Sequence, residues 1–213
     1  MIISHKYKFI FLKSKKTAGT SIEISLSRYC GKNDIITPIA PEDEEIRARM
    51  GIKPQNFMDD DNKEPKFFNH YKAKKVAKLV GEDIWNSYYK FSFDRNPWDK
   101  VISHYYFRAG KSKKNISFSE FLKRRKFKGA YNFPIYTIND RVAVDFLGKY
   151  ETLEEDLKKV CKEIGIPFDG WLPNAKGNFR KDRQHYRRHY NTAQKELVRK
   201  YFKKEIDLLG YEF

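Results

Sequence analysis

The sequence predicts an α/β fold in which helices flank one central, mainly parallel sheet. Short runs rich in aromatic and β-branched residues alternate with amphipathic segments, as in folds of this class. The chain has 213 residues, a length that suits one domain with a substantial core. Hydrophobic residues make up 40% and aromatic residues 16%, so the 34% of charged residues does not indicate disorder. We therefore expect residues 1–213 to form a single domain.

Three segments are the expected strands of the sheet. Residues 7–12 and 88–93 are dominated by aromatic and aliphatic side chains, and residues 142–147 combine Val, Phe and Leu. Each segment is followed by a stretch with helical periodicity. Strands that alternate with helices favour parallel pairing.

Helices are expected after each of these strands and at the C-terminal end. Thr20 and Ser21 offer capping hydroxyls to a first helix. Asn96 and Pro97 form a strong start for a long helix, with an N-cap residue and a proline in the first turn. The remaining helices are expected at 43–50, at 69–79 with Asn69 as N-cap, from Ser117 onward behind a capping box with Glu120, at 153–164 and at 193–209.

Two segments do not fit this alternation. Residues 34–66 hold four of the eight prolines and an acidic cluster, and they are expected to form an irregular acidic insertion. Residues 171–190 form a basic loop before the last helix. This loop is a candidate lid over a bound ligand.

The net charge of +16 indicates an anionic partner. The cations concentrate in the second half: residues 108–128 hold nine Lys or Arg against one Glu, and residues 176–204 hold eleven against two acids. A basic surface that is merely solvated is the competing interpretation. Charge alone does not name the anion.

Other features exclude several classes of protein. The two cysteines, Cys30 and Cys161, cannot supply a disulfide framework or a four-ligand zinc site. No apolar run approaches the roughly 18 residues of a membrane span, and the charged N-terminus does not resemble a signal peptide. We expect a cytoplasmic protein, or a trimmed lumenal Golgi domain if the source is eukaryotic.

The first candidate site is the turn Lys16-Thr17-Ala18-Gly19-Thr20-Ser21, between the first strand and the first helix. A helix N-terminus at the carboxyl edge of a sheet presents N–H groups and a positive dipole end to a phosphate. The glycine permits close approach of the backbone, and the hydroxyls and the lysine add donors. An ordinary capped helix start is the alternative. The P-loop of kinases and GTPases is a different pattern, because there the lysine follows the second glycine.

The second candidate site begins at Arg95, at the carboxyl end of the strand 88–93. Its guanidinium could grip a phosphate in bidentate fashion. Ser103 lies eight residues later, about two turns into the next helix. Taken alone, Arg95 would more often be an ion-pair partner and Ser103 a helix-surface serine.

Together and in this order, the two segments closely resemble the sulfotransferase superfamily, in the branch of glycan sulfotransferases such as the heparan 2-O type. Further resemblance lies in Phe68-Asn69-His70, in residues 144–151 and in residues 209–213; the acidic insertion and residues 108–128 lie outside it. The resemblance implies a P-loop-like three-layer domain. It also implies in-line transfer of a sulfuryl group from 3′-phosphoadenosine 5′-phosphosulfate (PAPS) to a hydroxyl of a carbohydrate-type acceptor, without a required metal, leaving adenosine 3′,5′-bisphosphate (PAP).

The resemblance also assigns roles to residues. Lys16 would stabilise charge on the leaving phosphate, although the family usually has a proline where this chain has Lys15, so both lysines are candidates. Residues 15–21 would bind the 5′-phosphosulfate, and Arg95 and Ser103 the 3′-phosphate. His70 would be the general base, kept neutral by a helix N-terminus; His104 is the rival base.

The basic loop supplies the remaining candidates. Arg183 and Tyr186 are expected to contact the nucleotide. Arg187, Arg188 and His189 are expected to contact the acceptor, which an overall basic surface suggests is an acidic or already sulfated glycan.

Two other function classes stay open at this point. A nucleic-acid-binding protein is compatible with the charge, although no helix-turn-helix, zinc-finger or RNP signature is recognisable. A nucleotide kinase with a degenerate P-loop is the other, and it would need magnesium and ATP.

Overall fold

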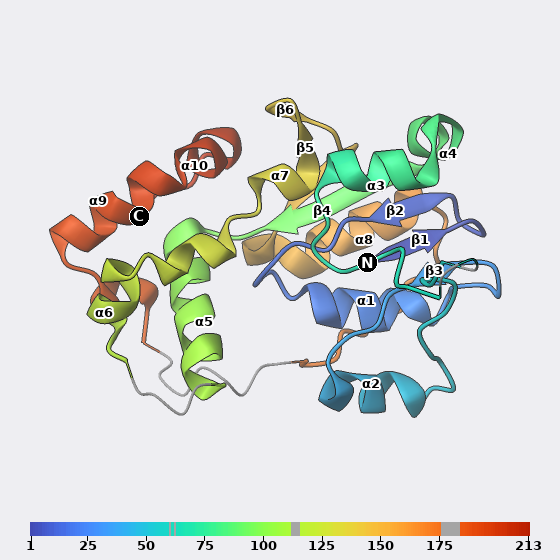
Figure 1. The fold of residues 1–213 in the computed structure, drawn as a ribbon, viewed down its shortest axis with the longest axis horizontal. Helices are drawn as coiled ribbons and strands as arrows, with labels where there is room; N and C mark the ends of the chain where they lie inside the picture. Colours follow the sequence, from blue (N-terminus) through green and yellow to red (C-terminus); the bar gives the residue numbers. More distant parts are fainter. Residues whose placement is uncertain (60, 62, 112–115, 176–183) are drawn as a thin grey trace.

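The computed structural model describes residues 1–59, 61, 63–111, 116–175 and 184–213. Five strands form its central sheet in the order β3–β1–β2–β4–β7 (Figure 1). They are β1 (Ile2–Ser4), β2 (Phe9–Phe11), β3 (Ile35–Ile36), β4 (Tyr89–Asp94) and β7 (Phe146–Lys149). β2, β4 and β7 pair in parallel, whereas β1 is antiparallel to β2 and β3. The expected α/β class is confirmed, and the sheet is mixed with a parallel core.

The third expected strand, residues 142–147, is divided between two sheets. Val142 belongs to β6 (Arg141–Val142), which pairs with β5 (Thr137–Ile138) in a separate hairpin. Asn139 and Asp140 take φ values of 50° and 62° at its turn, the left-handed pair that tight hairpins favour. The central strand β7 begins only at Phe146. The strand expected at 142–147 therefore begins about four residues too early.

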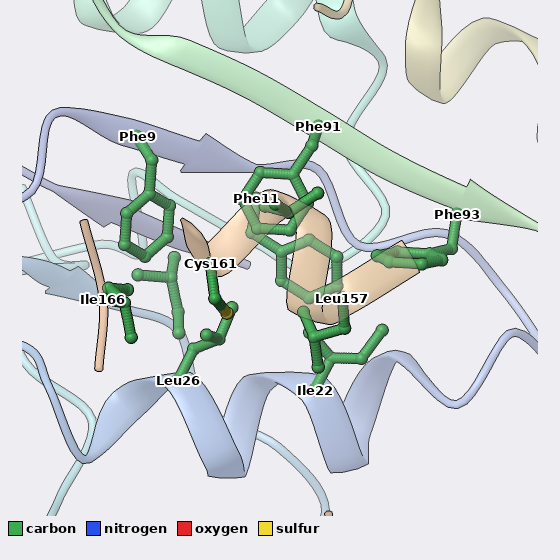
Figure 2. Close-up of a cluster of buried hydrophobic side chains, with 11 residues drawn as sticks. Phe9, Phe11, Ile22, Leu26, Phe91, Phe93, Leu157, Cys161 and Ile166 are labelled. Carbon is green, nitrogen blue, oxygen red and sulfur yellow. The ribbon is translucent and has the colours of Figure 1, made fainter. Parts of the chain in front are cut away.

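Helices cover both faces of the sheet because the strands alternate their side chains between the faces. On one face, Phe9, Phe11 and Phe91 pack against α1 (Gly19–Ser27) and α8 (Leu153–Glu163) (Figure 2). On the other face, Ile10 and Leu12 pack with residues of α3 (Ala73–Val80) and α7 (Phe133–Tyr136). This alternation produces the three layers.

A third cluster joins the helices beyond the carboxyl end of β4 (Figure 1). It is built around Trp98, Phe121 and Phe202, which lie on or beside α5 (Pro97–Gly110), α6 (Phe118–Lys123), η1 (Lys126–Ala130) and α9 (Thr192–Tyr201). The expected final helix 193–209 is interrupted at the buried Phe202, and α10 (Lys203–Leu209) follows. The break directs Glu205 into the interior.

The remaining elements are α2 (Pro41–Ala48), α4 (Glu82–Ser87), η2 (Tyr150–Thr152) and η3 (Tyr186–His189). α2 is the helix expected within the acidic insertion. The expected N-cap at Asn69 is wrong, because α3 begins at Ala73. Asn69 instead accepts a hydrogen bond from Thr37 Oγ1 at 2.9 Å and donates one to the carbonyl of Pro38 at 2.7 Å. Within the described residues, no helix has the length and hydrophobicity needed to cross a bilayer.

Candidate functional site

The β2–α1 loop (residues 12–18) leads from the centre of the sheet to the N-terminus of α1. Lys16 and Ala18 have φ values of 63° and 56°, so the loop turns twice through left-handed conformations. Ala18 is the N-cap, and no side chain caps the first turn of α1 within the described chain. Thr20 and Ser21 therefore lie inside the first turn rather than capping it. A helix start with no side-chain cap suits an external anion.

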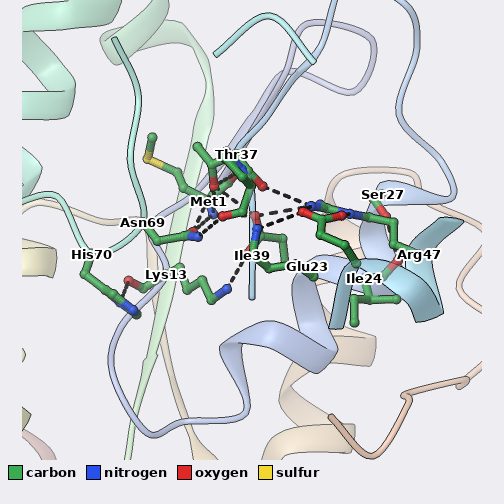
Figure 3. Close-up of polar contacts among 12 residues, drawn as sticks. Met1, Lys13, Glu23, Ile24, Ser27, Thr37, Ile39, Arg47, Asn69 and His70 are labelled. Atoms are coloured by element: carbon green, nitrogen blue, oxygen red, sulfur yellow. Dashed lines mark hydrogen bonds and ion pairs between the residues drawn. The ribbon is translucent and has the colours of Figure 1, made fainter. Parts of the chain in front are cut away.

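Buried contacts hold this loop. Ser14 Oγ bonds the carbonyl of Phe93 and lies 2.7 Å from Thr17 Oγ1. A Cβ at Gly19 would meet Lys13 Cγ at 2.8 Å, so a glycine is needed there. Lys13 itself is paired with the buried Glu23 at 2.5 Å (Figure 3).

The two candidate lysines have different surroundings. Lys16 is half-buried, and its Nζ lies 4.2 Å from the centroid of the Phe107 ring on α5. Lys15 is also half-buried, and burial together with the charge of Lys100 lowers its pKa. The Lys16 amine thus lies against α5, whereas the Lys15 amine lies within range of the charge of Lys100.

Arg95 lies beside this loop, as the two motifs require. Its Nη1 donates to the carbonyl of Lys16 at 3.3 Å, and its Nε and Nη2 donate to Asp99 Oδ2 at 2.9 and 2.6 Å. The guanidinium also stacks 3.9 Å from the centroid of the Tyr150 ring. Ser103 is half-buried on α5, and among the described residues no hydrogen bond joins it to Arg95 or the loop.

A cavity of about 620 Å³ opens between the start of α1 and Asp99, the ion-pair partner of Arg95. Its wall combines Ala18 and Ser21 with Asp99, Tyr150 and the first residues of α8. The volume suits a mononucleotide. Four carboxylates line it. Asp99 is paired with Arg95, Glu151 accepts hydrogen bonds from Asn96 N at 2.7 Å and the Tyr211 hydroxyl at 3.1 Å, and Glu154 and Glu155 lie at the start of α8.

His70 lies beside the start of the β2–α1 loop, at the carbonyl of Lys13. It does not begin a helix, so the expected dipole effect is wrong; it sits in a turn with a φ of 66°. Its Nδ1 is 3.0 Å from the carbonyl of Lys13 (Figure 3). Because a carbonyl only accepts, Nδ1 carries the proton and Nε2 keeps its lone pair. Desolvation of the ring by its neighbours, followed by the charge of Lys13, lowers the pKa of His70 to about 3, while the residue as a whole is exposed.

His104 also lies near the loop lysines. Burial, followed by the charges of Lys16, Arg108 and Lys15, lowers its pKa to about 4. Its ring packs edge-on against Phe121, and a Cβ at Gly129 would come within 2.9 Å of its Nε2. Both histidines are therefore neutral at pH 7, but His104 is the more enclosed.

The candidates in the basic loop separate into two groups, with Arg183 outside the described residues. Tyr186 accepts a hydrogen bond from Asn96 Nδ2 at 3.3 Å, which places it next to Arg95. Arg187 and Arg188 are exposed. His189 is half-buried, with its ring 6.2 Å from that of Tyr106 and 6.5 Å from that of Phe118, so it packs against the third cluster.

A second cavity, of about 350 Å³, lies between the C-terminal half of α5 and α6. Phe107, which Lys16 contacts, is part of its wall. The cations lining it are Arg108, Lys111, Arg124 and Lys126, and its other lining residues are apolar or aromatic.

Sequence reasoning missed a buried polar network behind the β2–α1 loop. Asn132 bonds the backbone of Lys15, and Asp94, Lys100 and Glu205 surround it. These residues come from four separate segments and follow no local motif. In the described part of the chain, no group of three or more His, Cys, Asp or Glu residues could hold a metal ion.

Comparisons with known proteins identify the family of this chain. The model of the sulfotransferase family matches residues 1–212. An uncharacterized protein of Archaeoglobus fulgidus is 48% identical over 96 residues, which cover 43% of this chain and 80% of that protein. No solved structure matches the chain significantly. Because the family model spans nearly the whole chain, this protein belongs to the sulfotransferase family, the enzymes that transfer a sulfuryl group from PAPS.

Proposed function

We propose that this enzyme transfers the sulfuryl group of PAPS in line to a hydroxyl of a carbohydrate-type acceptor, as in the glycan branch of the family. One observation carries the proposal: the guanidinium of Arg95 meets the carbonyl of Lys16, at 3.3 Å, beside the uncapped start of α1. Two motifs separated by almost eighty residues thus form one cationic region next to a nucleotide-sized cavity.

The residues present fit a nucleotide with two phosphate groups. The start of α1, with Thr17, Thr20 and Ser21, offers donors for the 5′-phosphosulfate, and Lys16 would stabilise the charge that develops on the leaving phosphate. Lys15 is the second candidate for that role. Arg95 is suited to binding the 3′-phosphate. Tyr186 is a second candidate, because its hydroxyl accepts a hydrogen bond from Asn96, the next residue after Arg95. When bound, PAPS supplies the activated sulfuryl group.

His70 fits the role of general base. Its Nε2 is unprotonated at neutral pH because Nδ1 donates to the carbonyl of Lys13. The residue is accessible from the surface, as an incoming hydroxyl requires. It would take the hydroxyl proton while the loop holds the donor in line.

The cavity beside Phe107 supports an acidic acceptor. Four cations line it, of which Arg124 is paired with Glu120 at 2.5 Å, and aromatic rings form part of its wall. Cations complement carboxylate or sulfate groups, and aromatic faces suit the apolar faces of sugar rings. Arg187 and Arg188 are further exposed cations for such an acceptor.

Calorimetric titration with PAP, AMP and ATP in the presence of a chelator tests this function. We expect PAP to bind preferentially and the preference to disappear in Arg95→Ala. A lack of preference for PAP would contradict the proposal. Magnesium-dependent binding of ATP would then favour a nucleotide kinase, and steeply salt-dependent binding of RNA or DNA a nucleic-acid-binding protein.

A further inference from the structure

Asn132 holds the backbone of the β2–α1 loop at two points. Its Oδ1 accepts from Lys15 N at 2.9 Å, and its Nδ2 donates to the Lys15 carbonyl at 3.0 Å. The side chain is fully buried, and 117 positions separate the two residues in the sequence. The peptide groups on both sides of Lys15 are therefore fixed immediately before Lys16 turns into its left-handed conformation.

The orientation of the Asn132 amide is itself determined by a carboxylate. Asp94 Oδ1 accepts from Asn132 Nδ2 at 3.0 Å, so the amide cannot flip without placing its oxygen against a carboxylate. The same Oδ1 accepts from the backbone N of Arg95 at 2.8 Å. Asp94 thus connects the loop that carries Lys16 with the residue expected to hold the 3′-phosphate.

The C-terminal helix α10 completes this support. Glu205 Oε1 accepts from the backbone N of Asn132 at 2.6 Å and of Phe133 at 2.9 Å. Lys100 Nζ bridges Glu205 and Asp94 at 2.5 and 2.6 Å, and all three side chains are fully buried. Removing one member of such a network leaves buried groups unsatisfied, so its geometry is specified closely.

We infer that Asn132 is a positioning residue for sulfuryl transfer, which sets the Lys15–Lys16 backbone and so aims the lysine amine at the leaving phosphate. The inference rests on the proposed function. The inference goes beyond that function by assigning a role to a residue that touches neither donor nor acceptor. A misplacement of about 1 Å in a reacting group can cost about 100-fold in rate.

The test compares Asn132→Ala with Thr137→Val, a matched control in the neighbouring segment. Thr137 Oγ1 is buried and donates to the Phe133 carbonyl at 2.7 Å, away from the loop. We expect Asn132→Ala to lower kcat about 100-fold with acceptor KM changed less than about threefold, and Thr137→Val to change neither. Equal small effects in both variants, with similar losses of unfolding free energy, would make Asn132 merely structural and overturn the inference.

A second variant keeps the inference testable if the alanine variant fails to fold. Asn132→Asp keeps the acceptor for Lys15 N but loses the donor to the Lys15 carbonyl. Protonating the introduced carboxyl restores a donor; the carboxylates of Asp94 and Glu205 raise its pKa, against the opposing charge of Lys100. We expect its kcat relative to wild type to rise several-fold between pH 8 and pH 6; a constant ratio would overturn the inference.

Hydrogen exchange separates failure of this inference from failure of the proposed function. We expect the amides of the peptide covering residues 13–19 to exchange faster in Asn132→Ala and not in Thr137→Val, whatever the enzyme transfers. If wild type does not bind PAP but this difference is seen, the proposed function fails, whereas the role of Asn132 in holding the loop stands. If PAP binds and the exchange rates are unchanged, only the inference about Asn132 fails.

Discussion

The buried cations around the β2–α1 loop and the exposed cations of the second half of the chain have different physical settings. Lys13 and Lys100 are buried, and both are paired with buried carboxylates. Arg187, Arg188 and Arg108 are exposed to solvent. A buried cation without a partner would be very costly, whereas an exposed one is held by water.

This difference explains why a net charge of +16 describes so little of the mechanism. The cations that determine the geometry of the loop are few, buried and compensated, and they add almost nothing to the net charge. The surplus charge lies on the surface, where it can attract an anionic acceptor and is screened by salt. The following predictions test whether the chemistry depends on the few side chains placed at and beside the loop rather than on the surplus surface charge.

The largest effect is expected for His70→Ala. Loss of the general base should lower kcat by about 10²–10⁴-fold, while PAP affinity stays within about twofold. Turnover assays and calorimetry measure the two quantities. His104→Ala is the control; a larger loss there would identify His104 as the base.

Lys16→Ala should lower kcat by about 10²–10³-fold, because charge on the leaving phosphate loses its stabilising amine. PAP affinity should fall less than kcat, and Lys15→Ala should have the smaller effect on rate. The reverse ranking of the two lysines would assign the catalytic amine to Lys15.

Arg95→Ala should weaken PAP binding by about 10–150-fold, the value of charge-assisted hydrogen bonds to a phosphate. Binding of AMP, which lacks the 3′-phosphate, should change much less. Asp99→Asn is the control, since it releases the guanidinium from its ion pair and should not weaken PAP binding. An equal loss for both nucleotides would remove Arg95 from the 3′-phosphate site.

The smallest effect is on stability as a function of pH. The pKa of His104 in the folded protein is about 4, below its ordinary value of 6.5, so the unfolded chain takes up the proton first as the pH falls. His104 should therefore cost about 2 kcal/mol of stability between pH 7 and pH 5. Urea unfolding gives the free energy of unfolding of wild type and of His104→Gln at each pH. The difference between the two proteins should change with pH, and the contributions of other titrating groups cancel in it. A difference independent of pH would show that His104 is not desolvated.

Local sequence was sufficient for the elements whose determinants lie close together in the chain. Asn96 caps α5 through a bond from Trp98 N at 3.1 Å, as its neighbour Pro97 suggests. The strand 88–93 follows from its aromatic composition, and the helix α8 from its helical periodicity. β1 and β3, on the antiparallel side of the sheet, were not predicted, because strands of three and two residues are too short to carry a periodic signal.

The candidate site divides in the same way. The two motifs, their order and the cationic surface are properties of the sequence, since they depend on residue type and spacing. Tertiary structure decided where the third strand lies, that His70 sits in a turn beside the Lys13 carbonyl rather than at a helix start, and that Asn132 holds Lys15. The physical reason is that these outcomes depend on buried hydrogen bonds between distant segments, such as Asn132 to Lys15 across 117 positions, and the partners of such bonds are chosen only when the chain packs.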